Sequence, residues 1–366
     1  MSRLRPAWVE IDFGALKHNV GLVRRRVGPK VRIFAVVKSH GFGCGAGPAG
    51  RAAIDGGADA LAVGDPDDVR EIRRAGIDVP VLLYASTTPD VAGEVVALGA
   101  IVTIHDLESL HAFAAVDRPV EAFVKVEAGL GRLGVPRKDW GEVFETASRS
   151  DTLRLTGIYT HLNAPDDADE IAQQIARYDD ACRQAEDMGL PGLTRMVASS
   201  LVTLGYPGLR YDAVNPGRFL FGLVEGKWAE IDAARPVIAA VRSRVIQVKE
   251  FAAGATVGFL GSKPLERATR LAVLPLGFGD GLNHLPPLGE LLVEGRRAPI
   301  IARRGIEHAV IDATGIPGVR VGSDAVLLGR QGGDEITAAE LAGWLNLPVL
   351  ELLPRLARTL PRQYLD

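Results

Sequence analysis

The chain has 366 residues, of which 47% are hydrophobic and 24% are charged, and its formal net charge is −3. This composition is typical of a folded globular protein, and the charge gives no electrostatic reason to expect binding to nucleic acid or to an anionic membrane. The chain has two cysteines, and no apolar run reaches the length of a signal peptide or a membrane span. We therefore expect a cytoplasmic protein without a disulfide framework.

The first two thirds of the chain alternate between strand-like and helix-like segments. A short strand is expected at about 6–13, and a helix over 15–26. Further strands, mostly separated by helices, are expected at 31–37, 58–63, 79–84, 100–104, 120–126, 153–160, 194–198 and 211–214. Eight such repeats predict an α/β fold, a closed parallel (β/α)8 TIM-type barrel. An open dinucleotide-binding sheet is disfavoured, because the glycines after the first barrel strand lack the G-x-G-x-x-G spacing.

The pattern changes after about residue 232. A long alternating strand is expected over 236–248, and short strands follow at 270–275, 290–293, 298–301, 309–312 and 325–328. Glycine and proline turns separate these strands, which predicts an antiparallel β domain. We therefore expect a barrel of residues 1–232 and a β domain of residues 233–366, with the strand at about 6–13 joining the β domain.

The first barrel strand ends on Lys38 and is followed by glycines at positions 41, 43, 45 and 47. A lysine in this place has two interpretations. It can extend its ammonium group into solvent as an ordinary surface residue. Alternatively, it can be a desolvated amine of lowered pKa that forms a Schiff base. The residues at the other strand ends decide between the two.

Barrel enzymes carry their chemistry at the carboxyl ends of the strands. The strand ends here carry Lys38, Lys125 followed by Arg132, His161, Ser199 and Ser200, and the Asn-Pro-Gly-Arg turn 215–218. The two serine hydroxyls and the Pro-Gly turn can hold a phosphate, and an arginine in a glycine-rich turn can bind a carboxylate. A lysine, a phosphate site and a carboxylate site on one face predict pyridoxal 5'-phosphate with an amino-acid substrate.

Several stretches resemble the alanine racemase family, the fold-type III pyridoxal phosphate enzymes. They are 8–12 (Trp-Val-Glu-Ile-Asp), 16–19 (Leu-Lys-His-Asn), 35–45 (Ala-Val-Val-Lys-Ser-His-Gly-Phe-Gly-Cys-Gly), 124–134 (Val-Lys-Val-Glu-Ala-Gly-Leu-Gly-Arg-Leu-Gly), 157–161 (Gly-Ile-Tyr-Thr-His) and 276–281 (Leu-Gly-Phe-Gly-Asp-Gly). The resemblance implies a barrel with a β domain. It also implies a head-to-tail homodimer in which each active site takes residues from the partner's β domain.

The resemblance assigns roles to individual barrel residues. Lys38 matches the lysine that carries the cofactor and acts as the base on one face of the substrate. Arg132 matches the arginine that contacts the cofactor's phenolic oxygen and the substrate carboxylate. Lys125 matches a lysine, often carbamylated, that orients this arginine, and His161 matches the histidine beside the cofactor ring.

Around the cofactor phosphate, the sequence only partly follows the family. Ser200, Gly217 and Arg218 match phosphate contacts. Phe42 stands in place of the family's phosphate-binding tyrosine, and Ser199 stands in place of an asparagine.

Three further departures bear on the reaction. The family's second base is a tyrosine in a Tyr-Gly-x-Thr stretch of the partner's β domain. The matching stretch here, 252–256, reads Ala-Ala-Gly-Ala-Thr and places Ala253 at the tyrosine position. Asn215 replaces the arginine that faces the pyridine nitrogen, so a neutral hydrogen bond replaces a permanent donor. A Met-Asp-Gln stretch near the partner's site reads Ile306-Glu307-His308 here, and Ile306 is expected to contact the substrate.

Three interpretations of the function remain open. The first is an amino-acid racemase or epimerase in which His308 or His40 replaces the tyrosine. The second is a pyridoxal phosphate enzyme of another type: a decarboxylase, an aldolase-type lyase or a one-base α-proton exchanger. The third is a non-catalytic protein that binds the cofactor, which the complete Arg132–Lys125 carboxylate site disfavours. We predict the racemase or epimerase, acting as a homodimer and without a metal site.

Overall fold

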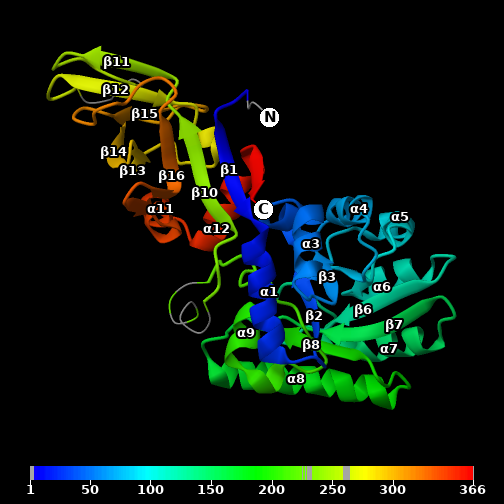
Figure 1. Cartoon of the computed structure of the whole chain (residues 1–366). Helices are drawn as coiled ribbons and strands as arrows, with labels where there is room; N and C mark the ends of the chain where they lie inside the picture. The colour runs from blue at the N-terminus through cyan, green and yellow to red at the C-terminus, as the bar shows by residue number, and fades with distance from the viewer. Residues whose placement is uncertain (1–3, 225, 227, 229–232, 259–263, 366) are drawn as a thin grey trace. The chain divides into compact units, whose positions relative to one another are not determined.

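The computed structural model describes residues 4–224, 226, 228, 233–258 and 264–365. The chain divides into two compact units (Figure 1). One unit comprises residues 15–235, and the other comprises residues 1–14 together with 236–366. No helix in the described ranges is both long and apolar enough to cross a membrane.

The unit of residues 15–235 is an eight-stranded parallel barrel. Its strands are β2 (Arg32–Val36), β3 (Ala60–Val63), β4 (Val81–Leu83), β5 (Val102–Ile104), β6 (Val120–Lys125), β7 (Leu153–Tyr159), β8 (Thr194–Ala198) and β9 (Ala213–Val214). They lie in the order β4-β3-β2-β9-β8-β7-β6-β5. A parallel bridge between Leu82 and Ile101 joins β4 to β5 and closes the ring. The predicted barrel is therefore confirmed.

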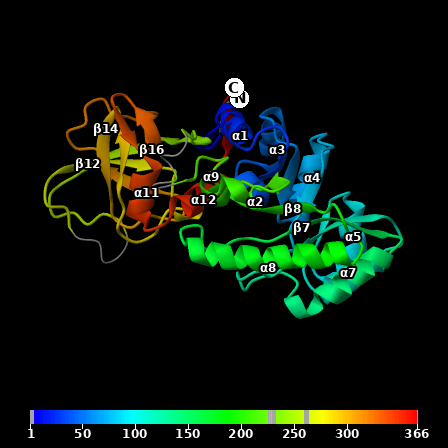
Figure 2. The same cartoon turned by 90° about the horizontal axis from the view of Figure 1, so that it is seen from below.

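Helices alternate with the barrel strands, and Figure 2 shows α3, α4, α5, α7 and α8 outside them. The helices are α1 (Phe13–Val27), α2 (Lys38–Phe42), α3 (Ala46–Asp55), α4 (Pro66–Arg74), α5 (Ala92–Ala97), α6 (Leu107–Ala114), α7 (Trp140–Arg149), α8 (Ala168–Asp187) and α9 (Ser200–Gly205). Asp106 caps α6, since its carboxylate accepts a hydrogen bond from the Ser109 N–H at 2.7 Å.

The second unit is built on a sheet that is mostly antiparallel, as predicted. Its strands are β1 (Ala7–Asp12), β10 (Ile238–Arg244), β11 (Gln247–Phe251), β12 (Thr269–Leu274), β13 (Glu290–Val293), β14 (Arg296–Ile301), β15 (Ala309–Asp312), β16 (Asp324–Gln331), β17 (Asp334–Ile336) and β18 (Arg362–Leu365). Two helices, α11 (Ala338–Leu345) and α12 (Val349–Thr359), belong to the same unit. Strand β1 pairs antiparallel with β10 and parallel with β18.

The long strand expected over 236–248 is a wrong prediction, because this segment forms parts of two strands. β10 pairs with β1 and β16, whereas β11 pairs with β12. The change of partner falls at Val245 and Ile246, whose N–H groups donate to Ser323 O and Val273 O. Alternation of apolar residues continues through this point, so the sequence pattern alone does not reveal the break.

Candidate active site

Lys38 follows β2, where the buried strand gives way to a left-handed turn. The lysine side chain is accessible to solvent. The next four residues all have positive φ: Ser39 (54°), His40 (56°), Gly41 (62°) and Phe42 (52°). Three of the four carry a side chain, for which this conformation costs about 1–2 kcal/mol per residue. Such a turn persists only where its surroundings impose it, and it fixes the direction in which Lys38 leaves the strand.

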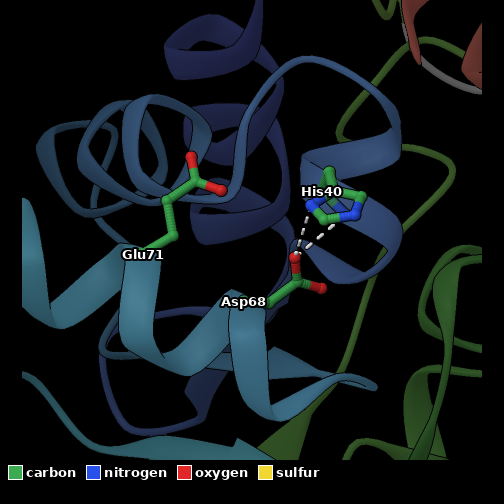
Figure 3. A group of neighbouring side chains, drawn as sticks. All are labelled: His40, Asp68 and Glu71. Carbon is green, nitrogen blue, oxygen red and sulfur yellow. Dashed lines mark hydrogen bonds and ion pairs between the residues drawn. The ribbon is translucent and has the colours of Figure 1, made fainter.

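Asp68 on α4 holds this turn in place (Figure 3). Its fully buried carboxylate accepts a hydrogen bond from the His40 N–H at 3.1 Å, and Nδ1 of the His40 ring lies 3.4 Å from the same oxygen. Burial raises the pKa of Asp68 to about 6. Polar side-chain atoms of Glu71, His40 and Asp68 lie within 4.8 Å of one another, but a Glu71 oxygen accepts a hydrogen bond from the Gly47 N–H at 3.0 Å. The structure therefore pairs His40, a candidate second base, with a helix of the barrel wall.

Five basic side chains gather at the carboxyl ends of the barrel strands. They are Lys38 after β2, Lys125 at the end of β6, Arg132 in the following turn, His161 after β7 and Arg218 after β9. The charges of Lys125, Arg132, Lys38 and Arg218 all act on His161. Within the described part of the chain, Lys38, Lys125 and Arg132 form no ion pair. The five residues are named here the cation cluster, and three of its members therefore lack an ion-pair partner among the described residues.

Burial and mutual repulsion lower the pKa values within the cation cluster. Burial lowers the pKa of Lys125 to about 8, with Arg132 adding to the effect. Burial also lowers the pKa of His161 to about 4. The pKa of Lys38 is lowered as well. The larger cause is the loss of water around the amine, and the smaller cause is the charge of Arg132. A cluster of this kind can bind anions, and it keeps an amine partly unprotonated as a nucleophile or base.

Ser200 and Gly217 join the loops that follow β8 and β9. The buried Ser200 Oγ accepts hydrogen bonds from the N–H groups of Gly217 (2.9 Å) and Phe219 (3.2 Å). A Cβ atom on Gly217 would come within 3.2 Å of Val36 and 3.4 Å of Phe42. The backbone at Gly217 therefore lies close to the end of β2, and a side chain there would require Val36 or Phe42 to shift slightly.

Phe42 and Ser199 lie beside this junction. The ring of Phe42 packs on Phe221 at a centroid distance of 4.6 Å, so the position offers an apolar wall rather than a hydroxyl. Ser199 precedes α9, and its side chain makes no capping hydrogen bond. The structure thus brings the predicted phosphate residues to one end of the barrel, together with the cation cluster.

Tyr84 is a residue of this region that the sequence analysis missed. It follows β4, and its hydroxyl accepts a hydrogen bond from Nδ2 of Asn215 at 3.1 Å. Asn215, which is 6% exposed, follows β9. A signal was available, because Tyr84 stands at the end of the strand expected over 79–84.

The remaining predicted residues lie in loops of the second unit. Ile306 and His308 belong to the loop between β14 and β15, and both are exposed. The loop is held to a neighbouring turn, because the Gly279 N–H donates to Ile306 O at 2.8 Å. Ala253 is exposed in the turn after β11. These residues and the cation cluster therefore belong to different units of the chain.

The fold and the cation cluster together define a class, that of (β/α)8-barrel enzymes that bind anionic ligands around a reactive lysine. Comparison with protein families identifies the family within this class. The family model for the alanine racemase N-terminal domain matches residues 11–225, and the model for the alanine racemase C-terminal domain matches residues 238–364.

Individual relatives agree with this result. The alanine racemase of Desulforamulus reducens is 30% identical over 98% of this chain and 99% of the relative. The crystal structure of alanine racemase from Bacillus anthracis with bound L-Ala-P has a TM-score of 0.91 and 25% identity, over 100% of this chain and 96% of that one. The alanine racemase of Streptomyces coelicolor has a TM-score of 0.88 and 29% identity, over 99% and 98% of the two chains. The chain belongs to the alanine racemase family.

Family membership confirms three predictions at the level of class. The fold is the expected barrel with a second, β-rich unit. The protein is an enzyme of the isomerase class, and its cofactor is pyridoxal 5'-phosphate.

Proposed function

We propose that the protein is an amino-acid racemase that uses pyridoxal 5'-phosphate on Lys38, and that the base on the second face of its substrate is not a tyrosine. The cation cluster is the observation that carries this proposal. Lys38, Lys125 and Arg132 lie at one barrel end without an ion-pair partner among the described residues. Anionic ligands are required to balance such a cluster, and an amino acid and a phosphorylated cofactor supply them.

The residues at the barrel end fit this cofactor. Ser200, Gly217 and Arg218 would hold its phosphate, and the ring of Phe42 would bound the space beside it. The close approach of Gly217 to Val36 leaves backbone, not side chain, facing that space. When bound, pyridoxal phosphate supplies an electron-accepting ring that makes the Cα–H of a linked amino acid acidic.

Arg132 is the proposed partner of the substrate carboxylate. Its guanidinium forms no ion pair in the described part of the chain, and its charge acts on Lys38 and Lys125. An arginine can bind a carboxylate through two parallel hydrogen bonds, which fixes the orientation of Cα as well as its position. Lys125 is buried, and the charge of Arg132 acts on it. It would orient the guanidinium by repulsion or, if carbamylated, by attraction.

Lys38 is the proposed base on one face of Cα. The left-handed turn held by Asp68 fixes where its amine emerges, and burial, together with the charge of Arg132, lowers the pKa of the amine and so favours its unprotonated form. His161 would remain neutral beside the ring, because burial and the surrounding cations hold its pKa at about 4.

The group on the opposite face is proposed to come from the second unit of a partner chain, in a head-to-tail homodimer. Residues 233–363 contain no tyrosine, so no shift of sequence register restores one there. We propose His308 for this role, because His40 is paired with Asp68. Exposed apolar side chains at Phe278 and Ile306, on two loops joined by hydrogen bonds, support an interface in this region.

A second candidate function is another pyridoxal phosphate reaction on the same residues: decarboxylation, aldol-type cleavage or one-base α-proton exchange. The absence of tyrosine from residues 233–363 favours it, because racemisation needs a proton donor on each face. Cofactor binding without catalysis is disfavoured, since it does not need the Arg132 carboxylate site.

The test is to incubate the purified protein and pyridoxal phosphate with L- and D-alanine, and then with a panel of other amino acids. Both enantiomers and any amine product are followed by chiral chromatography. Borohydride reduction followed by peptide mass mapping locates the cofactor on the chain. The proposal expects interconversion of enantiomers and a reduced adduct on Lys38. An adduct on Lys38 with net loss of amino acid would favour the second candidate, and no adduct would overturn both.

A further inference from the structure

Four polar side chains form a layer across the inside of the barrel. Thr103 Oγ1 and Tyr159 Oη lie 3.1 Å apart, and Asn215 Nδ2 donates to Tyr84 Oη at 3.1 Å. The rings of Tyr84 and Tyr159 are 5.9 Å apart between centroids, which connects the two pairs. We call these four residues the polar layer.

The strand order shows that these contacts cross the barrel interior. Tyr84 follows β4 and Asn215 follows β9, and β3 and β2 lie between those strands. Thr103 on β5 and Tyr159 on β7 are likewise separated by β6. Side chains can meet across one or two intervening strands only inside the ring. All four residues lie at or near the carboxyl ends of their strands. The polar layer therefore lies at the same barrel end as Lys38, which follows β2.

Asn215 is the one member of the polar layer with an unsatisfied atom. Its backbone N–H donates to Ala198 O at 2.9 Å, and its Nδ2 donates to Tyr84. Its Oδ1 is buried and has no hydrogen-bond partner among the residues that the structure describes. An unsatisfied buried acceptor is destabilising, and it gains most from a ligand that brings a donor to it.

The chemistry of the proposed cofactor leaves one group to meet this acceptor. Its phosphate and phenolic oxygen are anionic, as is the substrate carboxylate, and these groups require donors, which the cation cluster and Ser200 provide. A carbonyl oxygen repels all three. Apart from the aldehyde group, which the Lys38 amine would take up, the ring nitrogen is the remaining polar atom of the cofactor. It can donate a hydrogen bond only when it is protonated.

We propose that Asn215 Oδ1 accepts a hydrogen bond from the protonated ring nitrogen of pyridoxal phosphate, and that Tyr84 is a positioning residue that holds the amide in this orientation. This inference rests on the proposed function. Tyr84 acts through its hydroxyl oxygen, which binds Nδ2 and so turns Oδ1 the other way. With the amide reversed, Nδ2 would face the ligand and favour an unprotonated ring.

The consequence is electronic. A protonated ring withdraws more charge from the Cα that it activates than an unprotonated ring does. An acceptor bound to the protonated form raises the pKa of the ring nitrogen by about one pH unit. This shift corresponds to the free energy that a hydrogen bond to a charged group contributes. Asn215 and Tyr84 therefore increase the acidity of the substrate Cα–H, in addition to packing inside the barrel.

The test uses pyridoxal phosphate labelled with ¹⁵N in the ring, bound to the full-length protein. The ¹⁵N chemical shift distinguishes a protonated from an unprotonated pyridine nitrogen, and it is followed from pH 6 to pH 9. Wild type is expected to show the protonated shift at neutral pH. Asn215→Leu removes the acceptor and is expected to lower the transition by about one pH unit. Asn215→Asp supplies a charged acceptor and is expected to raise it.

Two variants isolate the role of Tyr84. Tyr84→Phe removes the oxygen that orients the amide and is expected to shift the transition in the same direction as Asn215→Leu, by less. Tyr159→Phe, the matched control, removes the hydroxyl on the other side of the polar layer and is expected to leave the transition unchanged. If Asn215→Leu fails to fold, the opposite shifts of Asn215→Asp and Tyr84→Phe still test the proposal.

Two results would overturn the inference. One is an unprotonated ring in the wild type at neutral pH, and the other is an equal transition in wild type and Asn215→Asp. Both results require bound cofactor on Lys38 and leave the proposed function standing. Failure of the label to bind Lys38 would instead overturn the proposed function, and with it this inference.

Discussion

The end of the barrel and the loops of the second unit differ in how they hold their candidate functional side chains. The barrel buries several of them, although Lys38 and Arg132 are exposed, whereas the loops expose theirs. In the barrel, Lys125, Ser200 and Asn215 are 4–6% exposed and are fixed by strand ends. In the second unit, Ile306 is 61% exposed and His308 lies two residues further along the same loop. Under the proposed function, the barrel would hold the cofactor. The group for the opposite face of the substrate would come from loops that a single chain leaves exposed.

The largest effect is expected where the barrel supplies the reacting atom. Lys38→Ala removes the amine that is proposed to carry the cofactor and to act as a base, so racemisation should fall at least about 10³-fold. The visible absorbance of lysine-linked pyridoxal phosphate should disappear with it, measured by spectrophotometry of the reconstituted protein. Lys17→Ala is the control, because that lysine is 48% exposed and pairs with Asp55 at 3.1 Å. An unchanged absorbance band in Lys38→Ala would contradict the assignment of Lys38 as the residue that carries the cofactor.

Arg132→Gln should have the next largest effect. Loss of the carboxylate partner should lower kcat/KM by about 10–100-fold, mainly through KM. The charge of Arg132 lowers the pKa values of Lys38 and Lys125, so its removal raises both. The unprotonated amine then becomes available only at higher pH. The acid limb of the pH–rate profile should therefore move to higher pH.

The matched control for this change is Arg154→Gln. Arg154 is exposed near the amino end of β7 and lies 3.6 Å from Glu121, away from the carboxyl ends of the strands. Its kinetics should match wild type. A shift of the acid limb to lower pH in Arg132→Gln would contradict the electrostatic account.

His308→Asn tests the proposed second base in the loop between β14 and β15. If His308 of the partner chain is the second base, racemisation should fall about 10²-fold. Exchange of the α-proton on the Lys38 face should persist, and deuterium incorporation followed by mass spectrometry separates the two effects. His111→Asn, on α6, is the control. Equal losses of exchange from both enantiomers would show that His308 supports folding or assembly, not one face.

Asp68→Asn is expected to have the smallest effect, and it is an effect on stability. The folded-state pKa of Asp68 is raised from 3.8 to about 6, so the folded protein binds the proton more tightly than the unfolded chain. Wild type therefore loses stability from this group as pH rises from about 4 to about 6. The neutral amide of Asn does not titrate, so the variant does not lose this stability as the pH rises. The free energy of unfolding of the variant, relative to wild type, should rise by about 1–3 kcal/mol across this window.

Chemical denaturation at pH 4.5 and pH 7 measures this difference. Asp67→Asn, exposed on the same helix, serves as the control. A variant that instead loses stability relative to wild type as pH rises would show that the charged carboxylate is needed to hold the His40 turn.

The barrel was predictable because its information is local. Each buried strand is a short apolar run, and each strand end is marked by polar or glycine residues. The cation cluster followed from the same list of strand ends. The break between β10 and β11 was not predictable, since it depends on which strands lie alongside and not on the alternation within the segment.

The finer geometry of the site depends on contacts between residues far apart in the sequence. The left-handed conformation of His40 depends on a carboxylate 28 residues away, and Asn215 bonds to Tyr84 at a separation of 131 residues. Neither contact leaves a periodic signal. Asn215 stood out in the sequence by its departure from the family, but its partner and its unsatisfied oxygen required the structure.

The central claim is that this barrel keeps the cofactor chemistry of a racemase while its second proton donor is not a tyrosine. The most direct test is deuterium incorporation at Cα in D₂O, from each enantiomer of a panel of amino acids, read by mass spectrometry after chiral separation. The account predicts incorporation with inversion, and loss of inversion but not of exchange in His308→Asn. Incorporation with complete retention in the wild type, or consumption of the amino acid without exchange, would contradict it.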